Sequence, residues 1–317
     1  MISKVAIVGS GYMGGGIAQV FALAGRDVVI ADVTGDIARS NLERLVAEAG
    51  AFAKDGLFPA DAAEDIGRRV TAAETIEEAV ADADFIVEAV FERIDVKHET
   101  LERISRAARP DAIIGSNTST ISINKLAEPV VRPERFLGVH FSNPAPFIPG
   151  VELIPHDGTD LSILPDVEEL LTASGKLSAR ISDATGFVLN RLQYALFHEA
   201  TQLVDEGVAS VEAIDTIVRT TFGFRLPFFG PFAIADMAGL DVYRFCYASF
   251  EADFPERFAT PAILQNLIDD GALGVKAGRG FLNAPPEDLP EIVAYRNRAY
   301  VAMAKLLDEL GPAPVTY

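Results

Sequence analysis

The sequence predicts an α/β domain with a mostly parallel sheet, followed by an all-α domain. A glycine-rich turn lies between two apolar runs near the start of the chain. Further short apolar runs alternate with helical patterns up to about residue 182, and only helical patterns follow. Strands that alternate with helices are typical of a parallel sheet covered on both faces. We therefore expect one domain at residues 1–182 and a second at residues 183–317.

In the first domain, short apolar runs indicate buried strands. Helices are predicted between several of them, over residues 14–24, 94–107 and 163–174. The predicted strands are residues 4–8, 26–32, 85–90, 112–116, 136–141 and 151–155.

The second domain begins with a long helical pattern, GFVLNRLQYALFHEATQLVDEG, at residues 186–207. Its apolar side chains recur at helical spacing, and Gly207 is expected to end the helix. Further helical stretches follow, the last being EIVAYRNRAYVAMAKLLDELG. The periodic positions are Phe187, Leu192, Leu196, Ala200 and Leu203.

Composition excludes several classes of function. The 317 residues include 27 basic and 46 acidic side chains, a net charge of −19, which repels nucleic-acid phosphates. The single cysteine, Cys246, excludes an internal disulfide, and we expect it to be a small buried side chain. Neither a signal-like start nor a membrane-spanning run is found. We expect a cytoplasmic protein with no nucleic-acid or membrane partner.

The stretch VAIVGSGYMGGGIAQVFALAGRDVVIAD, residues 5–32, predicts a dinucleotide site. Gly9 permits the tight turn after the strand, Gly11 lets the backbone approach a pyrophosphate, and Gly14 lets helix and strand pack closely. The helix N-terminus offers N–H groups to the phosphates. Asp32 ends the second strand, where it can accept bonds from a ribose and would repel a 2′-phosphate. The first domain is therefore expected to be a Rossmann-type domain that binds NAD rather than NADP.

Four polar residues in apolar surroundings are candidates for the chemistry: Ser119, His140, Glu152 and Asn190. A dehydrogenase needs a base to take the hydroxyl proton, and the ordinary pKa of histidine lies near neutrality. A glutamate can orient the imidazole and favour its cationic form. From the residues alone, a structural histidine, a solvated glutamate, a packing asparagine and a turn-forming serine remain alternatives.

The ordered motifs resemble those of the L-3-hydroxyacyl-CoA dehydrogenase superfamily. The likeness extends over nearly the whole chain, and so many matches in order are specific for superfamily and reaction type. The matching segments are GSGYMGGGIAQVFALAG, FIVEAVFERIDVKHE, SNTSTISI, GVHFSNPAP, VELI, GFVLNR, DMAGLD and GVKAGRGF.

The resemblance implies a role for each candidate. His140 would take the proton of the 3-hydroxyl, Glu152 would hold and polarise it, and Ser119 and Asn190 would bond the reacting oxygen or its neighbouring carbonyl. The resemblance also implies a homodimer formed by the helical domain and a substrate cleft between the two domains. No metal is expected. The residues that would bind NAD are Gly9, Gly11, Tyr12, Met13, Gly14, Asp32, Glu92, Lys97, Asn117, Asn143 and Lys276.

Two segments depart from the acyl-CoA enzymes. The helical segment over residues 35–58, which is lysine-rich in those enzymes, here has mixed charges and offers an anionic nucleotide little net attraction. The segment FGFRLPFFGPF is longer than the corresponding turn. This longer form, together with HFSNPAPFIPGVELIP, looks more like the branch that acts on free acids, namely L-gulonate 3-dehydrogenase (lambda-crystallin) and bacterial pyridine-carboxylate dehydrogenases.

The substrate expected from this branch is a small free carboxylate bearing a hydroxyl or an aldehyde. Arg225 is the candidate for gripping the carboxylate, because a guanidinium forms a planar fork for such a group. We expect the neighbouring phenylalanines 222, 224, 228 and 229 to wall that site, although Arg225 could instead be a solvated loop residue. An ordinary 3-hydroxyacyl-CoA dehydrogenase and a non-catalytic, crystallin-like structural protein remain the alternative functions.

Overall fold

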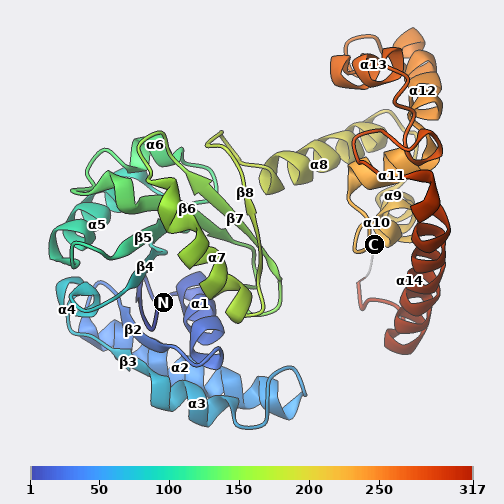
Figure 1. Cartoon of the computed structure of the whole chain (residues 1–317). Coiled ribbons are helices and arrows are strands. Elements are labelled where there is room, and N and C mark those ends of the chain that lie inside the picture. The colour runs from blue at the N-terminus through green and yellow to red at the C-terminus, as the bar shows by residue number, and fades with distance from the viewer. Residues whose placement is uncertain (1, 316–317) are drawn as a thin grey trace. The chain divides into compact units, whose positions relative to one another are not determined.

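A computed structural model of the chain describes residues 2–315, which form two compact units that divide between Leu196 and Phe197 (Figure 1). The first unit contains an eight-stranded sheet in the order β3-β2-β1-β4-β5-β6-β7-β8. All neighbouring strands are parallel except β6 and β7, which are antiparallel. The strands are β1 (Lys4–Val8), β2 (Asp27–Ala31), β3 (Val70–Ala72), β4 (Phe85–Glu88), β5 (Ile113–Ser116), β6 (Phe136–Phe141), β7 (Gly150–Pro155) and β8 (Leu177–Arg180).

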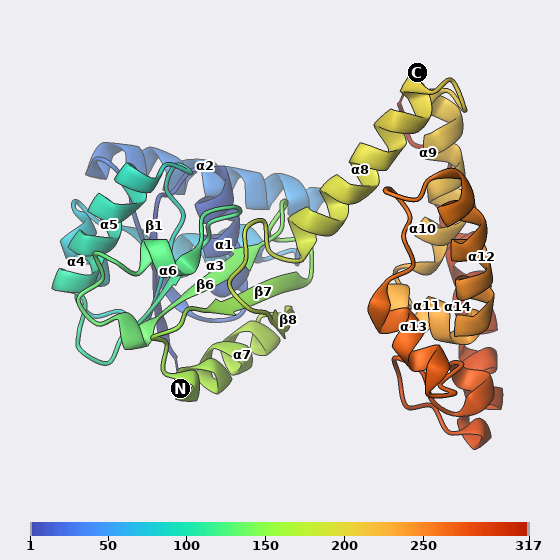
Figure 2. The same ribbon diagram turned by 90° about the horizontal axis from the view of Figure 1, so that it is seen from above.

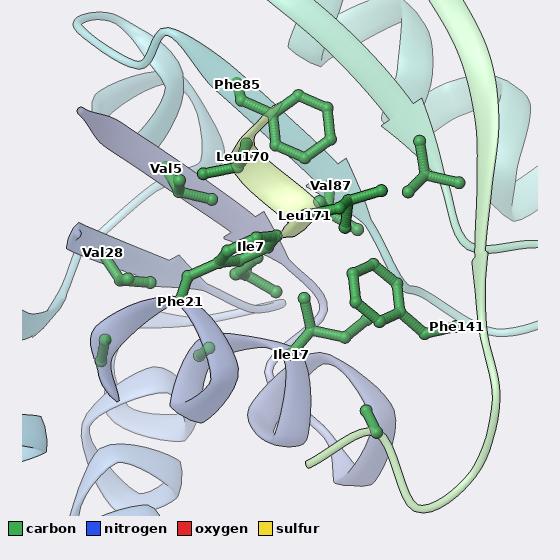
Figure 3. Close-up of a cluster of buried hydrophobic side chains, with 14 of the residues drawn as sticks. Val5, Ile7, Ile17, Phe21, Val28, Phe85, Val87, Phe141, Leu170 and Leu171 are labelled. Atoms are coloured by element: carbon green, nitrogen blue, oxygen red, sulfur yellow. The ribbon is translucent and has the colours of Figure 1, made fainter. Parts of the chain in front are cut away.

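Helices cover both faces of this sheet because alternate strand residues point to opposite faces. On one face Val5 and Ile7 pack with α1 (Tyr12–Leu23), α2 (Gly35–Lys54), α3 (Ala62–Arg69) and α7 (Leu164–Ala173). Figure 3 shows Phe21 of α1 and Leu171 of α7 among the strand side chains of this cluster. On the other face Ala6 and Val8 pack with α4 (Ile76–Val80), α5 (Ile94–Ala107) and α6 (Ile123–Leu126).

The second unit is helical (Figure 2). The division between the units falls within α8 (Leu189–Asp205). Among the described residues no helix is both long and apolar enough to cross a bilayer. The helices are α9 (Val211–Thr220), α10 (Phe222–Arg225), α11 (Pro231–Ala238), α12 (Leu240–Asp253), α13 (Ala262–Asp269) and α14 (Leu289–Leu310). A small buried cluster of Ala235, Leu240 and Leu264 lies where α11, α12 and α13 meet.

The predicted fold class is confirmed, with three differences in detail. The edge strands β3 and β8 were not expected. Phe187 does not belong to the helix, because it has a φ of +49° and is buried in the first unit, and α8 begins only at Leu189. The expectation that Cys246 is buried is wrong, because Cys246 is exposed on α12.

Candidate active site

The glycine turn between β1 and α1 has the geometry of a nucleotide cradle. Gly9 has a φ of +97°, and a Cβ on Gly14 would lie 1.8 Å from the Gly9 carbonyl oxygen. A Cβ on Gly11, in contrast, would meet no atom within 4 Å. Glycines are thus required by the turn and by the packing of α1, while the space beside Gly11 stays open at a helix N-terminus. This arrangement fits a pyrophosphate bound to the first amides of α1, at Tyr12 and beyond.

Asp32 follows β2 and lies beside this turn. One of its oxygens, Oδ2, accepts bonds from the Ser10 amide at 2.7 Å and the Ser10 hydroxyl at 2.6 Å, and the other accepts one from the Val33 amide. The carboxylate is therefore fixed where the first two strands end. Arg39, the first arginine after Asp32, is ion-paired with Asp36 and Glu74. Its charge is already neutralised by these two carboxylates.

His140 and Glu152 form a buried pair across β6 and β7. They are directly opposite in the antiparallel register, so their side chains lie on the same face of the sheet. The imidazole Nδ1 is 2.8 Å from Glu152 Oε2. Because a carboxylate only accepts hydrogen bonds, the proton of a neutral imidazole is on Nδ1 in this arrangement, which leaves a lone pair on Nε2. Nε2 lies 3.2 Å from the Ser119 hydroxyl.

The second Glu152 oxygen, Oε1, accepts bonds from the amides of Val188 at 3.0 Å and Leu189 at 2.9 Å. The ring of Phe187 packs on the imidazole of His140, with centroids 5.8 Å apart. The segment that leads into α8 therefore holds Glu152 and shields His140 from solvent.

Ser119 lies in a turn after β5 that a carboxylate holds in place. Glu92 accepts bonds from the Thr118 hydroxyl at 2.6 Å, the Ser119 amide at 2.8 Å and the Thr120 amide at 3.0 Å. Burial acts to raise the pKa of Glu92, but these bonds and the charge of Lys97 outweigh it, and the net pKa is lowered. Glu92 is thus held as the anion that the turn requires.

Asn190, at the start of α8, donates from Nδ2 to the Ser119 carbonyl oxygen at 2.9 Å. The structure therefore brings together the four candidate residues of the first unit: Ser119, His140, Glu152 and Asn190. Their roles in catalysis remain predictions. Asp183 adds a further anchor to this region, since it accepts bonds from the Ser122 hydroxyl and from the amides of Ile123 and Asn124.

Lys97 is 1% exposed and lies between two carboxylates. Its ammonium donates to Glu88 at 2.8 Å and is 3.4 Å from Glu92. Glu88, which is fully buried, also accepts a 2.5 Å bond from the Ser116 hydroxyl. The positive charge of Lys97 therefore stabilises the Glu92 carboxylate. The expected contact of Lys97 with the cofactor stays a prediction. Glu88 was not foreseen, although an acidic residue inside the apolar run FIVEAV was a signal.

The two asparagines expected to bind NAD, Asn117 and Asn143, occupy neighbouring strand ends. Asn117 accepts a bond from the Phe141 amide at 2.8 Å, and Asn143 is exposed just after β6. The loop after Asn143 is held by Lys176, whose buried ammonium donates to the carbonyls of Ala145 at 2.5 Å and Ile148 at 2.9 Å. Burial lowers the pKa of Lys176. Lys176 is a positioning residue that sequence analysis missed.

The candidates of the second unit are Lys276 and Arg225. Lys276 is ion-paired with Asp241, and its contact with cofactor phosphates stays a prediction. Arg225 ends α10 and lines a cavity together with Arg296. The four expected phenylalanines do not line this cavity. Three of them pack instead on Tyr295 or Tyr300 of α14: Phe224, Phe228 and Phe229.

Two family models match the chain. One, described as the NAD binding domain of 3-hydroxyacyl-CoA dehydrogenase, matches residues 4–184, and the other, described as its C-terminal domain, matches residues 186–284. The chain belongs to the 3-hydroxyacyl-CoA dehydrogenase family. The expected resemblance is therefore confirmed, and so is NAD as the cofactor. As a 3-hydroxyacyl-CoA dehydrogenase family member, the protein is an NAD-dependent oxidoreductase that acts on CH–OH groups.

The chain is similar to relatives that are named for two different activities. A 5-formyl-3-hydroxy-2-methylpyridine 4-carboxylate 5-dehydrogenase of Mesorhizobium japonicum is 34% identical, covering 97% of this chain and 99% of the relative. A 3-hydroxybutyryl-CoA dehydrogenase of Bradyrhizobium diazoefficiens is 35% identical, covering 89% and 95%.

The solved structures that resemble the chain also include both a 3-hydroxyacyl-CoA dehydrogenase and a pyridine-carboxylic acid dehydrogenase. The 3-hydroxyacyl-CoA dehydrogenase of Archaeoglobus fulgidus has a TM-score of 0.79 at 32% identity, covering 98% of this chain and 99% of its own. A pyridine-carboxylic acid 5-dehydrogenase described as an NAD⁺-dependent dismutase has a TM-score of 0.72 at 33% identity, covering 97% and 99%.

We predict that the enzyme uses NAD far better than NADP. A 2′-phosphate about 4 Å from Asp32 would cost about 4 kcal/mol at an effective dielectric constant of 20. Initial rates with each cofactor test this, and equal kcat/KM values would show that Asp32 does not discriminate. In the control Arg39→Ala, which removes the paired arginine, the preference for NAD should persist.

Proposed function

We propose that the protein oxidises a hydroxyl group of a small free carboxylate, with His140 as the base and Glu152 as its partner. The observation that carries this proposal is the hydrogen-bonded chain from Glu152 through His140 to Ser119, with separations of 2.8 and 3.2 Å. The lone pair of His140 Nε2, which faces the Ser119 hydroxyl in the structure, can accept the hydrogen bond of a substrate hydroxyl group instead. A complete series of hydrogen bonds from Glu152 through His140 to Ser119 argues against a crystallin-like structural role.

In this proposal, Nε2 of His140 takes the proton of the substrate hydroxyl as the carbon is oxidised. Glu152 stabilises the imidazolium that forms, because its charge lies 2.8 Å from Nδ1. Ser119 and Asn190 hold the reacting oxygen or its neighbouring carbonyl. NAD supplies the acceptor for the hydride that leaves the carbon.

The charges on α2 support a free acid over an acyl-CoA. Arg44 is paired with Glu48 at 2.7 Å, and Arg39 is paired with Asp36 and Glu74. Of the basic residues on this helix only Lys54, at its end, lacks a carboxylate partner among the described residues. A polyanionic coenzyme would find little net attraction here. The pyridine-carboxylate dehydrogenase relative supports the same substrate class, and Arg225 is the proposed carboxylate ligand.

The 3-hydroxybutyryl-CoA dehydrogenase relative favours a second candidate function, which is oxidation of a 3-hydroxyacyl-CoA. This alternative uses the same His140–Glu152 pair. It differs only in how the rest of the substrate is bound, so the substrate panel below decides between the two functions.

We also propose that the protein is a cytoplasmic homodimer. The second unit buries few apolar side chains, while α8 exposes several large ones. Leu192 and Leu196, four residues apart on α8, are 59% and 43% exposed, and Phe197 is 63% exposed. Contiguous apolar surface of this kind is typical of protein interfaces.

For the base, we predict that His140→Gln lowers kcat by about 10²–10⁴-fold, the usual contribution of a positioned general base. NAD affinity, measured by titration, should stay close to wild type because the histidine does not form the nucleotide cradle. His198→Gln, which alters an exposed histidine of α8, is the control and should keep wild-type kcat. Wild-type kcat in the His140 variant would rule out the mechanism.

Glu152→Gln tests the partner of the same pair. The glutamine oxygen can still accept from the Val188 and Leu189 amides, but the group facing His140 loses its charge. The imidazolium is then less stable, so the rising limb of the pH–rate profile should move to lower pH. An unchanged profile would mean that the Glu152 charge does not act on His140.

For the substrate, we predict that Arg225→Ala lowers kcat/KM for free acids about 10- to 150-fold, because a charged hydrogen bond contributes about 1.5–3 kcal/mol. The loss should largely vanish for esters or amides of the same compounds. Arg219→Ala, an exposed arginine of α9, is the matched control. Efficient reduction of acetoacetyl-CoA with poor rates for every free acid would favour the acyl-CoA function instead.

For the assembly, we predict that light scattering gives the mass of two chains. Leu192→Glu should shift the mass toward one chain, because it places a charge in the apolar surface, while Gln193→Glu on the same helix should not. A wild-type protein that stays monomeric at micromolar concentration contradicts the dimer.

A further inference from the structure

The second unit contains a cavity of about 360 Å³ between α10, α11 and α14. Its size falls in the range of small-molecule sites, about 300–1,000 Å³. Two arginines line it, Arg225 from α10 and Arg296 from α14. The remaining lining residues are Ile234, Met237, Ala238, Asn297 and Tyr300.

Among residues 2–315, no carboxylate lies within 4.0 Å of the guanidinium of either arginine. Other arginines of this unit differ, since Arg257 is paired with Glu199 and Glu206, and Arg244 lies 3.8 Å from Glu251. In a chain with 46 acidic residues and 27 basic ones, two cations left together in one cavity are an unbalanced charge. Their mutual repulsion is relieved when an anion binds between them.

The guanidinium of Arg296 is held by its neighbour. Asn297 Oδ1 accepts from Nε at 3.2 Å and from Nη2 at 3.0 Å, while Nη1 has no partner among the described residues. Arg296 and Tyr300 are four residues apart on α14, so they share one face of that helix. The guanidinium of Arg296 is thus oriented beside the phenol ring of Tyr300, and its Nη1 can still donate hydrogen bonds to a ligand.

Apart from Asn297, the remaining lining residues are apolar or aromatic. Ile234, Met237 and Ala238 occupy one face of α11, at spacings of three and four residues. The Tyr300 ring also packs on two phenylalanines that do not line the cavity. Its centroid is 5.7 Å from that of Phe224 and 6.2 Å from that of Phe228. A ligand of the cavity therefore has an apolar or aromatic body in addition to its charges.

From these observations we infer that the cavity binds a small dianion, with one anionic oxygen group held by Arg225 and the other by Arg296. This inference rests on the proposed function, in which Arg225 recognises a carboxylate, and it narrows the substrate class to acids that carry a second anionic group on a compact body. A monoanion satisfies one guanidinium and leaves the other uncompensated. Arg296 is then the residue that sets the preference for dianions.

The test uses two unreactive probes that share a ring and differ by one carboxylate. Phthalate is the dianion and benzoate the monoanion, and their affinities for the full-length protein are measured by calorimetry. Phthalate should bind wild type at least about tenfold more tightly, since the second charged bond contributes about 1.5–3 kcal/mol. Arg296→Ala should abolish this difference by weakening phthalate about 10- to 150-fold, with little change for benzoate.

Two further variants keep the result interpretable. Arg296→Lys keeps the charge but loses the planar fork, so it should retain part of the preference. Arg298→Ala removes a nearby arginine of α14 that does not line the cavity, and it should bind both probes like wild type. Equal affinity of wild type for phthalate and benzoate would overturn the inference. A change of oligomeric state in Arg296→Ala, without a change in phthalate affinity, would also overturn it.

Turnover separates this inference from the proposed function. If free acids are oxidised and Arg225→Ala impairs them, but Arg296→Ala raises KM equally for dianionic and monoanionic acids, the dianion site alone is wrong. If phthalate binding depends on Arg296 while only acyl-CoA esters are oxidised, the proposed substrate is wrong and the dianion site stands apart from it.

Discussion

The candidate site depends on the antiparallel pairing of β6 with β7. This is the one antiparallel contact in a sheet whose other neighbours are parallel, and it sets His140 directly opposite Glu152 on one face. Both strands are buried, so the imidazole and the carboxylate are held within the core rather than on a mobile loop. Ser119 completes the chain because β5 is the parallel neighbour of β6, which brings the end of β5 beside His140.

Carboxylates also hold the turns that bring the polar side chains together. Glu92 collects hydrogen bonds from residues 118–120, and Asp183 collects bonds from residues 122–124. Turns have amides that no strand or helix satisfies, and one carboxylate can accept hydrogen bonds from several of them at once. Lys97 places one positive charge between the carboxylates of Glu88 and Glu92. At Lys176 the charges are opposite: a buried ammonium group donates hydrogen bonds to three carbonyl oxygens of one loop.

Much of this fold could be predicted because its central strands are continuous apolar runs. β3 was missed because it has three residues, and β8 because it is an edge strand whose Leu177 is largely exposed. Phe187 matched the helical period by coincidence, since its side chain belongs to the core of the first unit. Ser119, His140, Glu152 and Asn190 could be proposed from motifs, but Asp183 and Lys176 could not. Their partners are main-chain atoms about 30 to 60 residues away, and such contacts leave no local pattern.

Glu152 gives its two oxygens to different parts of the molecule. One meets the imidazole, and the other receives the amides of Val188 and Leu189, where α8 begins. The first turn of α8 is therefore held by the same carboxylate that orients His140, the proposed base. A displacement of the first residues of α8 would move the Glu152 carboxylate, and this would change the tautomer and the ring orientation of His140. In the proposed mechanism, the start of α8 therefore helps to position the base, and a substitution there is expected to alter the reaction without touching a reacting group.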